Sequence, residues 1–363
     1  MAKLRVGLLF GGRSVEHEVS INSAYSIFRA LDPERYEVHV IAVDHAGRWH
    51  LSPPARPPQS PIEGDEVRAP AVPGERGLLP AAAGAAQPLA QLDILFPIVH
   101  GRGGEDGWLQ GLLELAELPY VGSGVLGSAL QMDKEVSKRL LHAAALPVLP
   151  WISVRAPELE RDAAAVVRRA SEEIGLPVFV KPANGGSSVG ISRAADADGL
   201  AAALREAARY DTKILVERAI PARDVEVALL GNEPVEASIV GEIRTRREFY
   251  DYEAKYVDED TELLVPAPIS EELSERLRAL AIEAFQALEG DGLARVDFVV
   301  DRDTEEFFVN EVNSLPGFTD VSMYPQLWQA TGLPYPALLD RLIELGMERH
   351  RRRSALETQY RRT

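Results

Sequence analysis

A chain of 363 residues is long enough to form two or three domains with substantial hydrophobic cores. Its net charge of −17 argues against a nucleic-acid partner, because such binding depends mostly on neutralising phosphates, and its lack of cysteine excludes disulfides and thiolate chemistry. No apolar run approaches the roughly 20 residues that a membrane helix needs, so we expect no membrane association and a cytoplasmic location.

The N-terminal part of the chain has the pattern of an open α/β sheet. Residues 4–10 form a continuous apolar run, typical of a strand buried in a parallel sheet, and further strands are predicted from Tyr36 and from Leu92. Glu16 follows the carboxyl end of the first strand, where such sheets bind ligands. A glutamate in the first turn of a helix can instead serve only the helix dipole, so its role stays open at this point.

Two later stretches of this region differ in the chemistry that they offer. Residues 51–90 are rich in proline and alanine, and we expect a long surface excursion with room for a short hairpin. No chemistry is evident in this stretch. Residues 100–111, HGRGGEDGWLQG, follow a strand end, and their glycines allow the backbone to approach a ligand closely. His100 and Glu105 are candidates to line a cleft opposite Glu16, although a lone histidine at a strand end is often structural.

A glycine- and serine-rich loop is predicted between two antiparallel strands in the middle of the chain. A helix over 132–145 precedes it, and the prolines that follow mark a domain boundary. The strand at 177–182 carries Lys181 near its end, and the loop at 183–190, ANGGSSVG, could fold over phosphates and bond them through backbone N–H groups. An ordinary flexible hairpin loop is the alternative, but a lysine so close to the loop favours phosphate binding.

The next segments supply candidate nucleotide contacts and a lid. Glu217, on the strand KILVERAI, could accept a hydrogen bond from adenine while the neighbouring backbone reads the edge of the base. A hairpin then begins at Asp224 and turns at 231–232. The segment FYDYEAKY at 249–256 is too irregular for a strand and could close over the substrate as a lid.

The central feature of the chain is a predicted hairpin over 292–317, which follows a helix over 270–288. Because side chains alternate along a strand, a turn near Thr304 sets Asp297 opposite Glu311 and Arg295 opposite Asn313 on one face. The other face is apolar and is expected to hold Val296, Phe298, Val300, Phe308 and Val312. Two carboxylates and an amide oxygen suit Mg²⁺, and the arginine beside them would stabilise an anion.

Two other interpretations compete with a metal site on this hairpin. The polar face could simply be solvated, as in many antiparallel sheets. A calcium loop is excluded, because Glu306 stands where that loop needs glycine and Val312 where it needs glutamate. Asn313 runs into a turn rather than a continuing strand, and Gly317 in that turn could bring a backbone N–H close to a ligand, which counts against a merely solvated face.

The chain ends in a basic stretch within an otherwise acidic sequence, RHRRR at 349–353. We favour a solvated or frayed terminus over a binding role for this stretch, because chain ends are often poorly ordered and charge runs are usually solvated.

Seven segments, taken in order, resemble the ATP-grasp enzymes and, within them, the D-alanine–D-alanine ligases. They are GGRSVEHEVS, HGRGGEDG, YVGSGVLGSALQMDK, VKPANGGSSVG, DYEAKY, RVDF and NEVNSLPGFT, and together they span nearly the whole chain. The resemblance implies an α/β protein with an ATP-grasp fold, α+β in its ATP-binding part, behind an open, Rossmann-like N-terminal domain. The implied domains are 1–130 for substrate binding, 131–220 with the phosphate loop, 221–348 with the lid and metal site, and a basic tail at 349–363.

The resemblance also implies a reaction. The γ-phosphoryl group of ATP passes to the carboxylate of one D-alanine, the amine of a second D-alanine attacks the resulting D-alanyl phosphate, and D-alanyl-D-alanine is released with phosphate for peptidoglycan precursor synthesis. Contacts with ATP are implied for Lys134, Lys181, Ser187, Ser188, Glu217, Arg218, Ile220, Asp224, Lys255, Asn310 and Glu311. Two Mg²⁺ ions, for which Mn²⁺ could substitute, would be held by Asp297, Glu311 and Asn313.

Catalytic and substrate contacts are implied for Glu16, His100, Ser187, Tyr256, Arg295, Gly317, Ser322 and Met323. Glu16 would hold the ammonium group of the first D-alanine and would be linked through Ser187 to Tyr256 on the lid. Arg295 and the Gly317 backbone N–H would receive the oxyanion, whereas Ser322 and Met323 would meet the carboxylate of the second D-alanine. A tyrosine at the lid accompanies dipeptide formation in this family.

Two positions depart from the commoner family pattern. Asp224 stands where the longer glutamate is usual, and Arg218 stands where lysine is usual. These departures concern the detail of the nucleotide contacts and leave the implied reaction unchanged.

Two other functions are compatible with parts of the sequence. A D-alanine–D-lactate ligase, or another ATP-grasp ligase that joins a carboxylate to an amine, would keep the metal and phosphate residues and differ in the substrate contacts. A catalytically dead nucleotide-binding protein would lack at least one metal ligand or phosphate lysine, and none is missing. A homodimer is the family expectation, and a requirement for a monovalent cation stays open.

Overall fold

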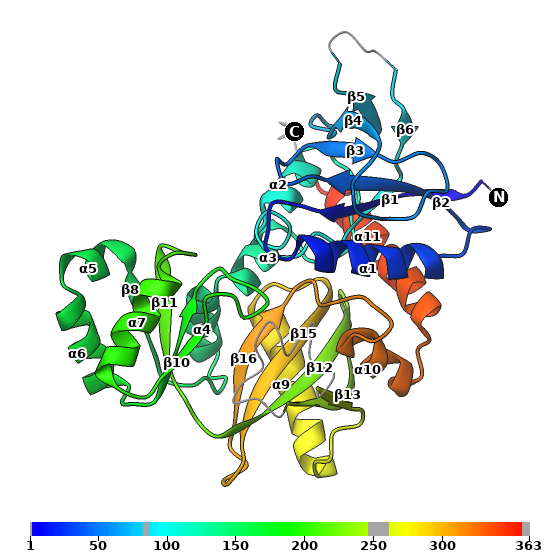
Figure 1. Cartoon of the computed structure of the whole chain (residues 1–363). Coiled ribbons are helices and arrows are strands. Elements are labelled where there is room, and N and C mark those ends of the chain that lie inside the picture. Colours follow the sequence, from blue (N-terminus) through cyan, green and yellow to red (C-terminus); the bar gives the residue numbers. More distant parts are fainter. Residues whose placement is uncertain (1, 83–86, 246–260, 358–363) are drawn as a thin grey trace, which may run out of the picture.

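The computed structural model describes residues 2–82, 87–245 and 261–357. Its sheets define three regions (Figure 1): a seven-stranded sheet in the N-terminal region, a four-stranded sheet in the central region and a five-stranded sheet in the C-terminal region. Helices pack against all three sheets, which confirms the predicted α/β class. Within the described ranges, no helix combines the length and apolar character that crossing a bilayer requires.

The N-terminal sheet combines a parallel core with an antiparallel extension. Its strands are β1 (Leu4–Gly11), β2 (Tyr36–Val43), β3 (Trp49–Leu51), β4 (Asp65–Arg68), β5 (Gly77–Pro80), β6 (Ala90–Gln91) and β7 (Ile94–Pro97). β1 lies between β2 and β7 and is parallel to both, whereas β3 to β6 add antiparallel neighbours beyond β2. α1 (His17–Ala30) packs on one face and α2 (Trp108–Leu115) on the other.

β1 is apolar along most of its length because both faces of the sheet are covered. Leu8 and Phe10 belong to the core that includes α1, and Leu9 belongs to the core that includes α2. Residues 51–90 do more than form a surface excursion, because they add β4, β5 and β6 to the sheet. The hairpin expected there is β4–β5, whose Val67 and Leu78 are buried.

The central region holds the predicted phosphate loop between antiparallel strands. Its elements are α3 (Val125–Met132), α4 (Lys134–Ala143), β8 (Trp151–Arg155), α5 (Ala156–Arg161), α6 (Ala163–Glu173), β9 (Val178–Pro182), β10 (Ser192–Ala194), α7 (Ala197–Ala207) and β11 (Lys213–Arg218). β9 pairs with β10 and with β11, antiparallel to both. The helix predicted over 132–145 begins only at Lys134, because the Asp133 side chain caps it by accepting the Val136 N–H.

The C-terminal sheet is antiparallel throughout its described strands. The elements of this region are β12 (Ala222–Gly231), β13 (Glu236–Arg244), β14 (Glu262–Leu264), α9 (Glu271–Ala287), β15 (Gly292–Asp301), β16 (Phe307–Asn313), α10 (Met323–Thr331) and α11 (Tyr335–Ser354). β12 lies between β13 and β15, and β16 forms an edge next to β15. The segment 249–256, predicted as a lid, lies outside the described residues.

The predicted register of β15 and β16 is confirmed at the polar residues. Arg295 lies opposite Asn313 and Asp297 lies opposite Glu311, but the next pair is Phe298 with Val309. A β-bulge at residue 310 therefore inserts one extra residue into β16.

The bulge changes which side chains of β16 are buried. Phe307 and Val309 lie in the hydrophobic core, so the prediction that placed Phe308 on the apolar face was wrong. The same bulge lets two consecutive side chains, Asn310 and Glu311, both line the polar side of the hairpin.

The described residues form four hydrophobic cores, and some of these cores are shared between regions whereas others are not. One core joins β1, β2, β7 and α1 to α10 and α11, so it belongs to the N-terminal and C-terminal regions together. A second lies between α9, α4 and the C-terminal sheet, and a third covers the other face of the N-terminal sheet. The fourth is confined to β8–β11 and α5–α7. The three-domain bounds given above stay a prediction.

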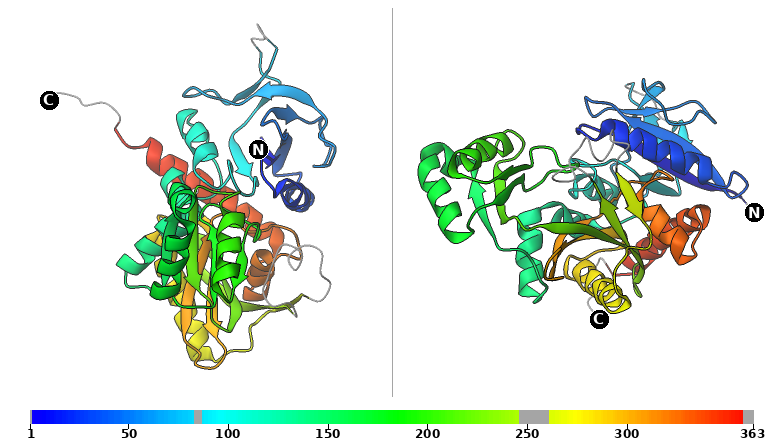
Figure 2. Two further views of the ribbon diagram at one scale, coloured as in Figure 1. Left: turned by 60° about the vertical axis from the view of Figure 1, so that its left-hand side comes forward. Right: turned by 60° about the horizontal axis from the view of Figure 1, so that its bottom comes forward.

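The basic stretch at 349–353 lies within α11 rather than in a frayed end. Figure 2 shows α11, in orange and red, beside both the C-terminal and N-terminal sheets, and it contacts β15 as well as β7. Arg349 is buried, with its guanidinium 4.0 Å from the centre of the Tyr120 ring and Nη1 3.3 Å from Glu114 Oε1. The expectation of a solvated terminus was therefore wrong for Arg349.

Candidate active site

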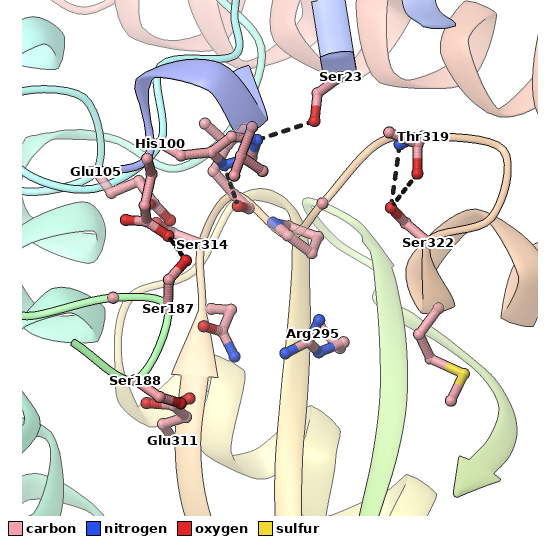
Figure 3. A pocket seen from close by; sticks show the side chains of 18 of the residues that line it. Ser23, His100, Glu105, Ser187, Ser188, Arg295, Glu311, Ser314, Thr319 and Ser322 are labelled. Carbon is pink, nitrogen blue, oxygen red and sulfur yellow. Dashed lines mark hydrogen bonds between the residues drawn. The ribbon is translucent and has the colours of Figure 1, made fainter. Parts of the chain in front are cut away.

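A cavity of about 660 Å³ opens between the three regions, and Figure 3 shows part of its lining. Its walls come from the start of α1, the loop after β7, the phosphate loop, the polar face of β15–β16 and the turn that leads into α10. The chain thus brings together segments that are far apart in sequence.

Glu16 and the phosphate loop are in direct contact. Ser187 Oγ donates a hydrogen bond to Glu16 Oε1, and a Cβ on Gly186 would collide with the same carboxylate. Ser187 and Ser188 have backbone φ angles of 47° and 58°, which residues other than glycine rarely adopt. Such strain often occurs at ligand sites, and here the hydrogen bond from Ser187 to Glu16 helps to hold the loop in this conformation.

His100 is a buried, hydrogen-bonded residue of the cavity wall (Figure 3). Its Nδ1 donates to the Leu315 carbonyl oxygen at 3.2 Å, and its Nε2 accepts from Ser23 Oγ at 3.1 Å. Burial lowers the pKa of His100 and outweighs the raising effect of Glu16. A neutral ring suits these two bonds, so His100 fixes the turn after β16 against α1.

Glu105 places a second carboxyl group on the same wall. Its Oε2 accepts the backbone N–H of Gly101 at 2.5 Å. Burial and the negative charge of Glu16 together raise the pKa of the Glu105 carboxyl to about 8. Glu105 therefore holds a proton at neutral pH and adds no negative charge beside Glu16.

The polar face of β15 carries a charged cluster. Arg295 Nε and Nη2 donate to Asp297 Oδ1 and Oδ2 at 2.6 and 2.7 Å, and Arg295 Nε lies 3.0 Å from Glu226 Oε2 on β12. Asn313 Nδ2 donates to Asp297 Oδ2 at 2.9 Å. The face is therefore a network of paired groups rather than a set of independently solvated side chains.

Lys134 connects α4 to this face and to the phosphate loop. Its Nζ lies 3.0 Å from Glu311 Oε2 and donates to the Gly185 carbonyl oxygen at 2.7 Å. Burial alone would lower the pKa of Lys134, but Glu311 and, more weakly, Glu105 and Glu16 outweigh it, so the pKa is raised. Lys134 therefore remains a cation next to the loop expected to cover phosphates.

A second cavity of about 170 Å³ continues from the first and holds the candidate nucleotide contacts. Lys181 Nζ donates to Glu217 Oε2 at 2.7 Å and to Asn310 Oδ1 at 3.1 Å. Glu217 also forms a buried ion pair with Lys138 of α4. Other predicted ATP contacts that line this cavity are Arg218, Ile220 and Asp224.

The turn after β16 supplies the candidates for the second substrate. Ser322 is the N-cap residue of α10, and its Oγ accepts the Thr319 N–H at 3.1 Å (Figure 3). Gly317, Ser322 and Met323 all line the first cavity, and a Cβ on Gly317 would lie 3.0 Å from Ser322 Oγ. A side chain at Gly317 would therefore crowd Ser322.

The two cavities contain every predicted site residue that the structure describes. Lys255 and Tyr256 lie outside the described residues. Sequence reasoning assigned no role to two charged side chains that contact the site, Lys138 and Glu226. A signal for Lys138 was present, because it follows Lys134 by four residues and so shares a helix face with it.

Comparisons with known proteins agree with one another. Residues 5–123 match the family described as "D-ala D-ala ligase N-terminus", and residues 140–344 match "D-ala D-ala ligase C-terminus". The chain belongs to the D-alanine–D-alanine ligase family. This confirms the resemblance seen in the sequence, and members of this family are ATP-dependent ligases with an ATP-grasp fold.

Relatives match along essentially the whole chain. The chain is 52% identical to the "D-alanine--D-alanine ligase A" of Chromobacterium violaceum, covering 98% of both chains, and 45% identical to that of Escherichia coli, covering 99% of this chain and 100% of the relative. The solved structure of the D-alanine-D-alanine ligase from Coxiella burnetii matches with a TM-score of 0.83 and 36% identity, covering 98% and 97% of the two chains. The VanG D-Ala:D-Ser ligase of Enterococcus faecalis also matches with a TM-score of 0.83, at 30% identity and 95% and 100% coverage.

Proposed function

We propose that this chain joins two molecules of D-alanine in a reaction driven by ATP, forming D-alanyl-D-alanine, ADP and phosphate for peptidoglycan precursor synthesis. The observation that carries the proposal is that one cavity is lined both by the buried carboxylate of Glu16 and by the guanidinium of Arg295. A small amino acid could place its ammonium group at the first and its reactive carboxylate at the second. Membership of the ligase family supports the same assignment.

The proposed metal ligands fit Mg²⁺ by their chemistry. Asp297, Glu311 and Asn313 offer hard oxygen atoms, and Mg²⁺ is commonly held by one or two carboxylates and completed by substrate phosphates. Within residues 2–82, 87–245 and 261–357 there is no group of three or more histidine and acidic side chains arranged for a metal. That finding fits a site completed by phosphate oxygens. When bound, the metal would neutralise charge on the transferring phosphoryl group.

In the first step, cationic side chains position the phosphates and the substrate. Lys134 and Lys181 border the cavity expected to hold ATP, and Lys255 is proposed to join them. The bond between the γ-phosphorus and the oxygen of ADP breaks, and a bond forms from that phosphorus to a carboxylate oxygen of the first D-alanine. Positioning and charge neutralisation are the main demands of phosphoryl transfer, and these lysines meet them.

In the second step, the amine of the other D-alanine attacks the carbonyl carbon of the acyl phosphate. As the C–N bond forms, phosphate leaves with the electrons of the broken C–O bond, and the proton that the amine gives up can pass to this phosphate. Negative charge develops on the carbonyl oxygen in between. Arg295 and the backbone N–H of Gly317 line the cavity where that oxyanion would form, and donors in such positions lower the barrier.

The second substrate is the point on which structural neighbours differ. One neighbour is named a D-Ala:D-Ser ligase, so the shared fold does not select between the two products. Ser322 and Met323 border the expected position of the second substrate. We favour the dipeptide of D-alanine because Tyr256 stands at the lid position that accompanies dipeptide formation.

The test is to incubate the purified protein with ATP, Mg²⁺ and D-alanine, alone and with equimolar D-serine or D-lactate. Phosphate release and product mass are followed together. We expect phosphate release with D-alanyl-D-alanine as the dominant product at neutral pH. No phosphate release with D-alanine would overturn the proposal, and a dominant mixed product would change the second substrate.

Variants of the same hairpin test the metal assignment within this assay. Glu311→Gln should abolish ligation with only a small loss of thermal stability. The side chain keeps its size at a partly exposed position, and Lys134 loses its ion pair but still donates to the Gly185 carbonyl oxygen. Asp303→Asn, in the exposed turn of the hairpin, is the matched control and should keep full activity. Retained turnover in Glu311→Gln would contradict the metal assignment.

Further elements of the proposal follow from the family. We place the protein in the cytoplasm, where its nucleotide is available, and propose that it forms a homodimer. Mn²⁺ should replace Mg²⁺, because both ions prefer oxygen ligands in octahedral sites. A monovalent cation is proposed as an additional activator, to be tested by replacing K⁺ with a bulky organic cation in the assay.

A further inference from the structure

Lys138 is a buried charge to which the proposed reaction assigns no role. Its side chain is 1% exposed, and it lies one helical turn after Lys134, so both ammonium groups project from the same face of α4. Lys134 pairs with Glu311, whereas Lys138 pairs with Glu217. Removing a cation from water in this way is unfavourable, so the position of Lys138 against Glu217, which lines the nucleotide cavity, calls for an explanation.

Glu217 is held between two lysines that differ in their surroundings. Its side chain is 2% exposed. Lys138 reaches it from α4, and Lys181 reaches it from the neighbouring strand β9 at 2.7 Å. Lys181 also lines the nucleotide cavity and contacts Asn310, so it can be redirected towards a ligand, whereas Lys138 is enclosed.

The charge of Glu217 depends on these partners. Burial by itself raises the pKa of Glu217, but the ammonium groups of Lys138 and Lys181 outweigh it and the pKa is lowered. Burial lowers the pKa of Lys138, and Glu217 opposes that effect. Two lysines therefore share the compensation of Glu217: Lys138 is enclosed, whereas Lys181 lines the cavity and can be redirected.

We propose that Lys138 is a positioning residue that keeps Glu217 compensated when Lys181 turns from Glu217 to a nucleotide phosphate. The inference rests on the proposed function, in which Glu217 meets adenine and Lys181 meets phosphate. A phosphate group and Glu217 compete for the charge of Lys181. Without Lys138, that competition would leave a buried carboxylate without a nearby cation, which is strongly unfavourable.

The proposal makes a different prediction from a simple structural role. If Lys138 only oriented Glu217 towards adenine, its loss would weaken adenosine and ADP equally. If Lys138 releases Lys181 for phosphate, loss of Lys138 should weaken the binding of ADP much more than the binding of adenosine. Adenosine has no phosphate to recruit Lys181. The ratio of the two dissociation constants is therefore the decisive quantity.

The experiment measures binding of adenosine and of ADP to the full chain by calorimetry, without D-alanine. Lys138→Met should fold, because Lys181 still compensates Glu217, and circular dichroism checks this. We expect this variant to lower the affinity for ADP by about 10- to 100-fold and the affinity for adenosine by less than about threefold. Lys138→Arg should keep much of the ADP affinity, and Arg139→Met, next on the helix but facing solvent, should bind both as the parent chain does.

A double variant tests whether Lys138 acts through Glu217. In Lys138→Met/Glu217→Gln no buried carboxylate needs a counter-ion, so the ratio of ADP to adenosine affinity should return to that of Glu217→Gln alone. Equal losses for both ligands in Lys138→Met, or no loss, would overturn the inference while leaving the proposed function intact. A parent chain that binds neither ligand, or a Lys181→Met variant with an unchanged ratio, would overturn the nucleotide assignments as well.

Discussion

The protonation of Glu105 follows from its neighbours rather than from its own chemistry. It shares a cavity wall with Glu16, and the charge of Lys134 opposes the resulting rise in the pKa of Glu105. Burial and Glu16 raise its pKa from an ordinary value of 4.5 to about 8. The folded protein therefore binds a proton at Glu105 that the unfolded chain releases at lower pH.

This shift predicts how stability depends on pH. For a carboxyl group with a raised folded pKa, stability is highest below about pH 4.5 and falls as pH rises towards about 8, because the folded state binds more protons over that range. Glu105→Gln removes this dependence, so the variant should gain stability relative to the parent chain from pH 5 to pH 8. The gain should be at most about 1.4 kcal/mol per pH unit, measured by urea unfolding.

Glu34→Gln is a suitable control for that measurement, because Glu34 is exposed between α1 and β2 of the N-terminal region. Its stability should follow that of the parent chain at every pH. A difference between Glu105→Gln and the parent chain that stays constant from pH 5 to pH 8 would contradict the raised pKa.

At the level of elements, the sequence predicted those features that depend on a local pattern of residues, such as the start of a strand or the pairing across a hairpin. β2 begins at Tyr36 as predicted, and Asp297 and Glu311 are paired as alternation and turn position required. The bulge at residue 310 was missed although a signal was present, because strict alternation from Glu311 would place Asn310 on the apolar face beside Phe308 and Val312. One extra residue in the strand removes that conflict. Arg349 was misjudged because its burial depends on Tyr120, more than two hundred positions away in the chain.

The bulge predicts unequal effects for two adjacent phenylalanines of β16. Phe307→Ala should destabilise the protein by about 3 kcal/mol or more, because Phe307 lies in the core and its ring is 4.6 Å from the Arg276 guanidinium. Phe308→Ala is the matched variant and should cost about 1 kcal/mol, because its side chain is partly exposed. Chemical denaturation measures both. Without the bulge the order would be reversed.

At the scale of the whole molecule, the hydrophobic cores group regions that are not consecutive in the sequence. The N-terminal and C-terminal regions share one core, in which Leu8 and Phe10 of the first strand lie with Leu338 and Leu342 of the last helix. The central region has a core of its own, which contains Val180 and Leu204. No local sequence pattern predicts that the two ends of a chain will pack together. The sequence therefore predicted the elements of this core but not their association.

This division predicts which parts of the protein unfold together. Leu342→Ala and Leu204→Ala each remove a fully buried side chain, and each should cost about 3 kcal/mol within its own core. Native-state hydrogen exchange should show that Leu342→Ala accelerates exchange in both β1 and β15, because they border the shared core, whereas Leu204→Ala accelerates it mainly in β9 and β11. If Leu342→Ala accelerated exchange in β15 and left β1 protected, the N-terminal sheet would be an independent unit. The expected result for Leu204→Ala, fast exchange confined to the central region, would show that this region can unfold locally while the other two regions stay folded.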